Sequence, residues 1–347
     1  MQITPLRRAD VPELSQFLTK GISVSATSPL FSPEVLSWKY FDGPGGPAGD
    51  SGSSLVARSG GRIIGHIGMC FRQLIVPGDG AAAVPTMHAM DWLSSPTHPG
   101  SGVLLMLRAC ATSPTQFAVG GTPEARAIFP SLGFEQKPGV ASFVKRLKPS
   151  HRLRAPGEGV VRKWVGTAKD VAFAWLARTP PVSQAVELRS VPTFTEEIDC
   201  LQRPHSQHVV TCRRDHVLLN SLLRCPVSGF SGWTIHASQR MIGFAVLKVT
   251  AHGRTRIGII VDCWLNTADP SFWQAAVAAL NDRLRALSTY YVRAYAITPS
   301  LHAALLLNGF TRLDEVNVYV RDKQRLLPRD AHFGLSRLDV EGAIHFE

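Results

Sequence analysis

Three short motifs occur twice in this chain, in the same order. The pairs are Arg62-Ile63-Ile64-Gly65 with Arg240-Met241-Ile242-Gly243, Asp91-Trp92-Leu93 with Asp262-Cys263-Trp264-Leu265, and Leu132-Gly133-Phe134 with Asn308-Gly309-Phe310. From the first motif glycine to the last, the separation is 68 residues in one half and 66 in the other. Self-similarity at matched spacing is typical of a duplicated structural unit. The sequence therefore predicts two tandem units of the same fold.

The length and composition agree with two compact units. The chain has 347 residues, about twice a typical domain, and 45% of them are hydrophobic, which is enough to build buried cores. No stretch approaches the roughly 20 apolar residues that cross a bilayer, and residues 1–18 lack the apolar core of a signal peptide. We therefore expect no membrane span and a cytoplasmic protein.

The cysteines and the charge limit the kinds of partner. Six cysteines are scattered without a C-x-x-C pair, so neither a zinc site nor a disulfide framework is indicated, and we expect no metal. The net charge of +11 favours an anionic partner such as a nucleotide cofactor, an acidic carrier protein, nucleic acid or a membrane surface. Nucleic acid is the least favoured, because the sequence has no aromatic-rich basic platform.

The order of elements divides the chain into four parts. Residues 1–147 form a first unit, in which the pattern predicts a strand, two helices, two strands around a Ser-Gly-Gly turn, and a long strand. A glycine-rich turn, a helix, a strand, a helix and a closing strand complete this mixed α/β unit. Residues 148–189 are interpreted as a basic linker with an apolar helix, residues 190–322 as the second unit, and residues 323–347 as a C-terminal extension.

Each half resembles the GNAT superfamily of acyl-CoA-dependent N-acyltransferases. Residues 121–134, GTPEARAIFPSLGF, are similar to the family's helix that ends in a Gly-Phe turn. Residues 96–107, PTHPGSGVLLML, are similar to its cofactor-binding turn. The resemblance implies an α/β fold of the α+β type: two tandem GNAT-like domains, each a mixed, mostly antiparallel sheet flanked by helices. It also implies acetyl-CoA or another acyl-CoA as the acyl donor.

The cofactor turn of such a fold works through backbone N–H groups at a helix N-terminus, which point at the pyrophosphate. Read from Pro99 to Leu104, the sequence departs from the family's pattern at both of these residues, whereas Thr97 to Gly102 keeps both glycines. An ordinary chain-reversing loop is the alternative. The cofactor-binding residues that the resemblance implies are Thr97, His98, Gly100, Ser101, Gly102 and Val103.

The second half lacks this signature. Residues 265–280 contain no Gly-x-Gly, and Asp269 would repel a pyrophosphate. Asp269 and Pro270 instead resemble a plain N-cap and first helical position. We therefore expect the second domain to be degenerate, and catalysis to centre on the first.

Candidate catalytic residues lie on and after the long strand before the turn. His88 has a side chain whose pKa suits a general base, Asp91 is a second candidate base, and Ser95 could hydrogen-bond substrate or water. A structural role is the alternative for each, and the recurrence of Asp91 as Asp262 favours it for Asp91. The tyrosine that often acts as the family's general acid is replaced by Phe129 in the first half and Leu305 in the second.

Candidate substrate-binding residues lie on the second helix and the first hairpin. Trp38 and Tyr40 belong to a helix that borders the acceptor site in the resembled family, and His66 lies beside Gly65 on a strand. Packing in the core is an equally good interpretation of the two aromatic residues, and a hydrogen-bonded or exposed histidine without contact to substrate is the more common alternative for His66.

These observations predict a transferase that moves an acetyl or other acyl group from acyl-CoA to a primary amine of a small molecule. Amino sugars, amino acids and natural-product intermediates are the candidate acceptors, by analogy with tandem enzymes of biosynthesis. A non-catalytic GNAT-like scaffold is one alternative. A transferase that takes its acyl group from acyl carrier protein or aminoacyl-tRNA is another, motivated by the charge and the basic linker.

Overall fold

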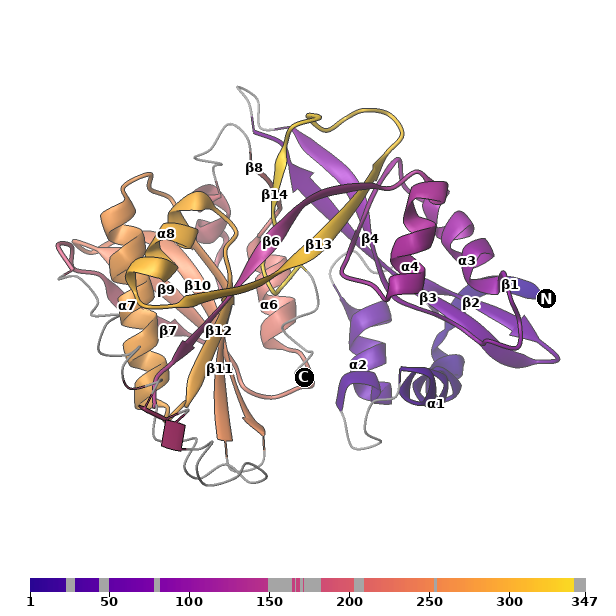
Figure 1. The fold of residues 1–347 in the computed structure, drawn as a ribbon, viewed down its shortest axis with the longest axis horizontal. Helices are drawn as coiled ribbons and strands as arrows, with labels where there is room; N and C mark the ends of the chain where they lie inside the picture. The colour runs from indigo at the N-terminus through magenta and orange to yellow at the C-terminus, as the bar shows by residue number, and fades with distance from the viewer. Residues whose placement is uncertain are drawn as a thin grey trace.

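A single sheet runs through the whole molecule (Figure 1). The computed structural model describes residues 1–22, 29–43, 50–77, 82–148, 182–202, 209–252 and 255–339, with 164–165, 167–168 and 171. Across these residues the strands follow the order β1-β2-β3-β4-β5-β13-β6-β12-β11-β10-β9-β7, and β8 and β14 are attached beside β3. The pairs β4–β5, β11–β12 and β8–β14 are parallel and the others antiparallel. The expected fold class, a mixed and mostly antiparallel sheet with helices, is confirmed.

The first half follows the predicted order of elements. They are β1 (Gln2–Arg7), α1 (Val11–Gly21), α2 (Pro33–Ser37) with a π-helical turn η3 (Trp38–Asp42), β2 (Ser51–Ser59), β3 (Arg62–Ile75), β4 (Ala83–Ser94), α3 (Ser101–Cys110), β5 (Thr115–Val119), α4 (Pro123–Ile128) with a 3₁₀ turn η4 (Phe129–Leu132), and β6 (Glu135–Arg146). Short turns η1 (Arg8–Asp10) and η2 (Pro29–Phe31) lie beside α1 and α2.

The second half repeats this order with a 3₁₀ turn in place of α1 and with two additional strands, β8 and β14. Its elements are β7 (Glu187–Val191), η6 (Glu196–Leu201), β8 (Val209–Cys212), α6 (His216–Leu223), β9 (Phe230–Ala237), β10 (Arg240–His252), β11 (Thr255–Leu265), α7 (Pro270–Ala286), β12 (Tyr291–Tyr295), α8 (Pro299–Leu307), β13 (Thr311–Asp322) and β14 (His332–Gly334).

Side-chain caps explain where several helices begin. Ser32 accepts a hydrogen bond from the amide of Val35 at the start of α2, and Asp269 accepts one from the amide of Ser271 at the start of α7. Each cap is followed by proline, whose missing N–H costs nothing at the first helical position. The N-caps predicted at Ser32 and Asp269 are therefore confirmed.

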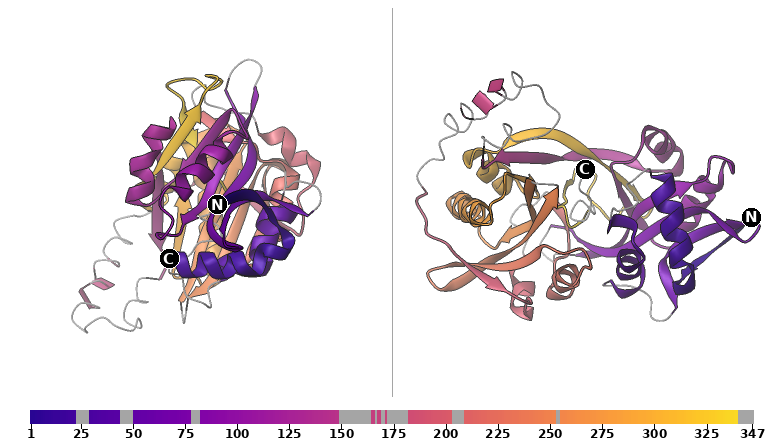
Figure 2. Two further views of the ribbon diagram at one scale, coloured as in Figure 1. Left: turned by 90° about the vertical axis from the view of Figure 1, so that its right-hand side faces the viewer. Right: turned by 90° about the horizontal axis from the view of Figure 1, so that it is seen from below.

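The two halves exchange their last strands. Strand β13 of the second half lies between β5 and β6 of the first half, and β6 in turn pairs with β12 of the second half. The register joins Tyr319 to Ala118 across β13–β5, and Ala294 to Phe143 across β12–β6. Figure 2 shows β6 and β13 side by side as they cross from one half to the other. The sequence predicts two sheets in tandem but not their union by exchanged strands.

The division at residues 147, 189 and 322 stays a prediction. The end of β6 at Arg146 and the end of β13 at Asp322 lie close to two of these boundaries. The apolar helix predicted in the linker lies almost wholly outside the described residues. Within the described part of the chain, no helix is long and apolar enough to cross a membrane.

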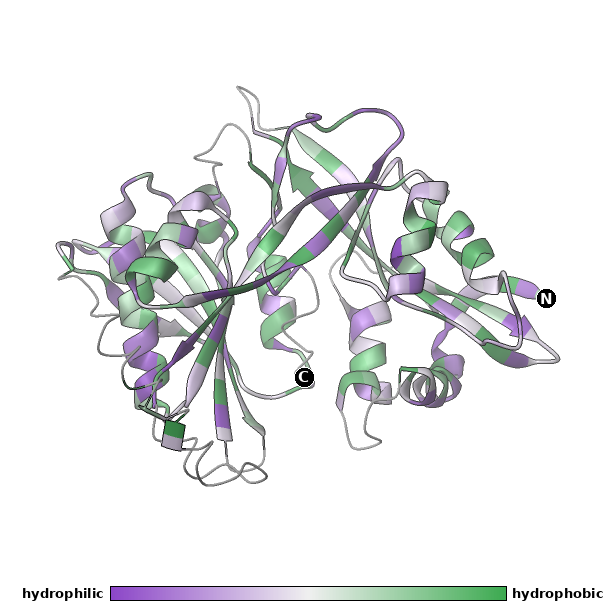
Figure 3. Ribbon diagram, viewed as in Figure 1, coloured by the Kyte–Doolittle hydropathy of each residue, from purple (hydrophilic) through white to green (hydrophobic). Residues whose placement is uncertain are grey.

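Buried hydrophobic residues form four clusters around the sheet. In the first half one cluster packs α3 against the strands and another packs α1 and α2, and the largest cluster fills the second half. A fourth cluster lies at the seam and combines Leu74 and Phe117 of the first half with Val210, Val318 and Leu335. Figure 3 shows green residues along the strands and purple residues on the outward surface of α7. The seam is therefore a core shared by both halves.

Lys248 is a charged residue in this interior. It lies on β10 with its side chain fully buried and its ammonium 4.6 Å from the ring centroid of Phe230. Burial lowers the pKa of the Lys248 amine from 10.5 to about 8, because desolvation disfavours the charged form. In the unfolded chain the same amine stays protonated up to about pH 10.

This pKa predicts a rise in stability at alkaline pH. Below pH 8 the folded protein must hold a buried charge, and the resulting loss of stability is relieved as the pH rises from 8 toward 10.5. We expect Lys248→Met to be more stable than the wild type at pH 7, by up to about 3 kcal/mol, and the difference to shrink by pH 10. Urea unfolding of both proteins at the two pH values measures this, and parallel pH profiles would contradict it.

Candidate functional site

The turn between β4 and α3 places backbone amides at a helix N-terminus without a side-chain cap. Gly100 is the N-cap residue with φ = 84°, a left-handed conformation that glycine adopts without strain, and no side chain caps the helix there. The turn is closed by local bonds: His98 N–H donates to the Ser95 carbonyl and the Ser101 hydroxyl donates to the His98 carbonyl. The amide of Ser101 is used within the turn, where it donates to the His98 carbonyl at 3.3 Å, so an anionic ligand would bind the remaining amides of the first turn.

Gly102 has a packing role in this turn. A Cβ at Gly102 would lie 2.9 Å from Ser94 Oγ and 3.3 Å from the indole nitrogen of Trp92. The Trp92 indole donates to the Gly102 carbonyl at 2.9 Å. Gly102 therefore lets α3 approach the end of β4 and does not face the solvent. With Gly100 as N-cap and Gly102 in the first turn, the placement fits the register that runs from Thr97 to Gly102.

A shallow depression of about 680 Å³ lies at this helix N-terminus. Thr97, His98, Gly100, Ser101 and Val103 all line it, so the structure brings five of the six predicted cofactor-binding residues together. Met1, Pro99 and Leu104 complete the lining. The surface that lines it is mostly apolar, which suits the apolar part of a ligand whose phosphate lies at the helix N-terminus.

The corresponding helix in the second half begins differently. The carboxylate of Asp269 accepts hydrogen bonds from the amide and the hydroxyl of Ser271, at 2.9 and 2.7 Å. These bonds lower the pKa of Asp269, so its negative charge occupies the N-terminus of α7. An anionic ligand at α7 would meet that charge, whereas α3 begins with Gly100 and carries none.

We expect Gly102→Ala to destabilise the protein by about 1–2 kcal/mol, because its Cβ would overpack against Ser94. Alanine otherwise favours a helix over glycine, so Ser94→Ala should recover more than half of this loss in the double variant. Denaturant unfolding of the four proteins measures the coupling, and additive losses would contradict the packing role.

A second group of candidates gathers at a bulge in β4. The register between β3 and β4 shifts between His66, which faces Leu93, and Gly68, which faces Met90. Asp91 lies in the bulge with φ = 46°, a conformation uncommon for a residue other than glycine. Strained backbone of this kind persists only where surrounding contacts hold it.

The contacts that hold Asp91 come from η3. Its Oδ2 accepts hydrogen bonds of 2.5 Å from Lys39 Nζ and from the Tyr40 hydroxyl. The side chains of Lys39 and Asp91 are 5% and 4% exposed, so the ion pair is buried. Gly68 makes room for this arrangement, because a Cβ there would lie 2.7 Å from the Tyr40 hydroxyl. We name Lys39, Tyr40, His66 and Asp91 the bulge cluster.

His66 and Trp38 extend the bulge cluster in two directions. His66 is fully buried, and its Nδ1 lies 3.0 Å from the Asp91 carbonyl, with its ring 5.2 Å from that of Tyr40. Trp38 points the other way, and its indole donates to the Ser221 carbonyl of α6 at 3.0 Å. The three predicted substrate-binding residues are thus neighbours, but Trp38 joins the two halves of the molecule.

The other two catalytic candidates lie apart from the carboxylate of Asp91. His88 is 4% exposed and stacks on Phe117, with ring centroids 4.5 Å apart and planes 2° from parallel. Ser95 belongs to the turn before α3: its hydroxyl lies 2.8 Å from that of Thr97, and its amide donates to the Ile64 carbonyl. Ser95 therefore supports the glycine-rich turn before α3. Their catalytic roles stay predictions.

Phe129, at the position where the resembled family often has a tyrosine, is packed among aromatic rings. Its ring centroid lies 4.6 Å from that of Tyr319, 5.2 Å from Phe134 and 6.0 Å from Trp92. Tyr319 comes from the exchanged strand β13, so residues of both halves surround the ring of Phe129.

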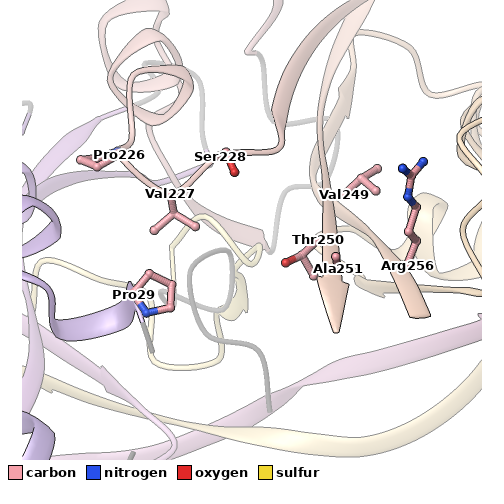
Figure 4. Close-up of a pocket in the computed structure, with 8 residues that line it drawn as sticks. All are labelled: Pro29, Pro226, Val227, Ser228, Val249, Thr250, Ala251 and Arg256. Carbon is pink, nitrogen blue, oxygen red and sulfur yellow. The ribbon is translucent and has the colours of Figure 1, made fainter. Parts of the chain in front are cut away.

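A separate pocket of about 540 Å³ lies between the halves (Figure 4). Pro29 and Val227 face one another on one side, and Thr250 lies across from them. The pocket contains no predicted site residue. Among the described residues, no group of three or more His, Cys, Asp and Glu side chains could hold a metal ion.

Removal of the Asp91 charge should destabilise the fold. Asp91→Asn keeps a side chain that tolerates φ = 46° but takes the carboxylate from a buried ammonium, at a cost of about 3 kcal/mol. Lys39→Met in the same protein removes that ammonium and should restore most of the stability. Thermal and urea unfolding of the single and double variants test this. Equal stability of Asp91→Asn and the wild type would show that the pair contributes little.

Solved structures resemble this chain over nearly its whole length. A GCN5-related N-acetyltransferase from Anabaena variabilis matches with a TM-score of 0.63 and 12% identity, over 93% of this chain and 73% of that one. A probable N-acyltransferase from Enterococcus faecalis gives 0.60 and 11%, over 93% and 72%. The N-myristoyltransferase of Saccharomyces cerevisiae, with bound myristoyl-CoA, gives 0.58 and 11%, over 92% and 82%.

The chain adopts the tandem GNAT fold. No family model matches the sequence, and no curated protein sequence matches it. At 11–12% identity these likenesses show the fold alone. The fold predicted from the repeated motifs and the resemblance is therefore confirmed, and the structural neighbours are acyltransferases.

Sequence reasoning missed two charged residues. Lys39 lies between two candidates, Trp38 and Tyr40, and its pairing with Asp91 depends on the π-helical turn, which no sequence signal indicated. Arg214 pairs with Asp262, the counterpart of Asp91, and is fully buried. In the sequence, Arg214 is a charged residue between two apolar segments, β8 and α6, and this pattern could have identified it as a buried cation.

Proposed function

We propose that this protein is an N-acyltransferase that takes an acyl group from acyl-CoA and transfers it to a primary amine of a small molecule. One observation carries the proposal: α3 begins at Gly100 with no side-chain cap, whereas α7, its counterpart, begins with the carboxylate of Asp269. Only the first of these two helix termini suits a pyrophosphate. The N-myristoyltransferase match, which holds myristoyl-CoA, supports an acyl-CoA donor.

In this proposal the turn from Thr97 to Val103 holds the pyrophosphate. Backbone amides of the first turn of α3 supply the hydrogen bonds, and the helix dipole adds to them. The acyl group would then reach the bulge of β4, where a thioester carbonyl needs hydrogen-bond donors as negative charge develops on its oxygen. Trp92, whose indole bonds the Gly102 carbonyl, links the turn to the bulge.

We assign Asp91 a positioning role. Its carboxylate is already bonded by Lys39 and Tyr40, which leaves it poorly suited to remove a proton from an amine. It fixes the Tyr40 phenol beside His66 and stabilises the strained backbone of the bulge. His88 stays the proposed general base, because an imidazole changes its charge near neutral pH.

Leu104→Glu tests the cofactor site directly. Leu104 lines the depression and is 48% exposed, and a glutamate in the first turn favours the helix while it repels a pyrophosphate. We expect the dissociation constants of coenzyme A and acetyl-CoA, measured by titration calorimetry, to rise at least about tenfold, which is 1.4 kcal/mol. Leu107→Glu is the matched control, because Leu107 is equally exposed one turn later and does not line the depression.

The comparison of the two variants decides the outcome. Weakened binding in Leu104→Glu alone supports the site. Equal loss in both variants indicates a general effect of charge, and the absence of binding to the wild type would exclude an acyl-CoA donor. A screen of primary amines with acetyl-CoA, followed by thiol release, then tests the transfer itself.

A further inference from the structure

A fully buried arginine in the second half is shared by two carboxylates. Arg214 Nε donates to Asp262 Oδ2 at 2.6 Å, and its terminal nitrogen donates to Asp339 Oδ2 at 2.5 Å. A third bond goes to the Cys212 carbonyl at 2.5 Å. All three charged side chains are 0% exposed. One cation thus joins three segments that are distant in the sequence, and we name Arg214, Asp262 and Asp339 the buried clamp.

The clamp stands where the bulge cluster stands in the first half. Asp262 is the counterpart of Asp91, and the register of β10–β11 shifts beside it, between Val246 and Leu247. In the first half the carboxylate holds Tyr40 near the sheet, whereas in the second half it holds Arg214. The same position of the fold has therefore acquired a different partner.

Arg214 is tied to the first half by the strand that precedes it. Strand β8 pairs with β3 through Cys212 opposite Leu74, and the amide of Arg213 donates to the Gln73 carbonyl at 2.7 Å. Strand β3 also carries His66. The chain thus passes from a strand bonded to the first half directly into the clamp of the second.

The C-terminal segment is the third part that the clamp holds. Strand β14 pairs with β8, and beyond it Leu335 is buried in the seam cluster while Leu338 is buried in the core of the second half. Asp339 follows at once, and its Oδ2 also accepts the amide of Ser336 at 2.7 Å. Residues 335–339 therefore connect the seam with the second core and end on Arg214.

Helix α6 connects the buried clamp to the bulge cluster. It begins at His216, two residues after Arg214, and the carbonyl of Ser221 on this helix accepts the Trp38 indole. Trp38 is the residue before Lys39, which pairs with Asp91. A shift at Arg214 would move α6 and, through Trp38, the bulge cluster.

We propose that Arg214 is a positioning residue for acyl transfer. By joining Asp262 to Asp339 it fixes residues 335–339 and α6 to the second half, and through Ser221 and Trp38 it sets the placement of the bulge cluster. The catalytic part of this inference rests on the proposed function, whereas the structural part stands independently of it.

Hydrogen exchange of the full chain tests the structural part. Arg214→Met keeps the apolar stem and removes the cation, and Arg240→Met, at an exposed position at the start of β10, is the matched control. We expect amide exchange in β8, α6, β14 and residues 335–339 to accelerate at least tenfold in Arg214→Met, with α3 unchanged. Asp339→Asn, which leaves the Arg214–Asp262 pair intact, should accelerate exchange in residues 335–339 alone and serves if Arg214→Met does not fold.

Kinetics test the catalytic part. With an amine acceptor in hand, Arg214→Met should raise the KM for the amine or lower kcat at least tenfold, while the dissociation constant of coenzyme A stays unchanged. Arg214→Lys, which keeps one ammonium, should recover part of the loss. Exchange that is unchanged in both clamp variants, or that rises equally across both halves, would overturn the proposal. If hydrogen exchange changes as expected but the wild type transfers no acyl group to any amine, the proposed function is rejected, whereas the structural role of the clamp stands.

Discussion

The pairing of β6 with β13 is the constraint on which the rest of the structure depends. Each strand leaves its own half and completes the sheet of the other, so β5 of the first half is covered by β13, and β12 of the second half by β6. Burial of Val318 and Phe117 in a shared seam cluster follows from this exchange. Neither half can open its sheet without exposing strand edges and apolar side chains to water. The two candidate sites, the turn before α3 and the bulge cluster, thus belong to a sheet that both halves complete.

The same position in the duplicated fold serves two different purposes. Asp91 lies in a β-bulge and Asp262 lies beside one, and in both cases a buried cation bonds the carboxylate. Lys39 and Tyr40 place a phenol and a histidine at the first bulge, whereas Arg214 joins the second to the C-terminal segment. Buried ion pairs are costly to form and costlier to break on one side only, which suits them to fix a geometry. In the first half this position belongs to a candidate reaction site, whereas in the second half it holds the C-terminal segment in place.

Much of the fold could be predicted from the sequence because its signals are local. The repeated motifs predicted the duplication, and Ser32, Asp269 and the glycine-rich turn predicted where helices begin. The exchange of β6 and β13 could not be predicted, because the residue pattern of a strand indicates which of its faces is buried and not which strands lie beside it. The sequence also indicated Asp91 and Tyr40 as candidate site residues. It did not indicate Lys39, since the bond from Lys39 to Asp91 depends on a π-helical turn. Ser95 is a catalytic candidate by its place after the strand, and in the structure its hydroxyl contacts that of Thr97 in the glycine-rich turn.

The most direct test of the central claim, that the first half alone binds the acyl donor, is a crystal structure of the protein with acetyl-CoA or coenzyme A. We predict one molecule per chain, with pyrophosphate oxygens within hydrogen-bond distance of the backbone amides at the start of α3 and none at Asp269. Coenzyme A bound at α7, or bound away from the turn that contains Gly100, would contradict the account.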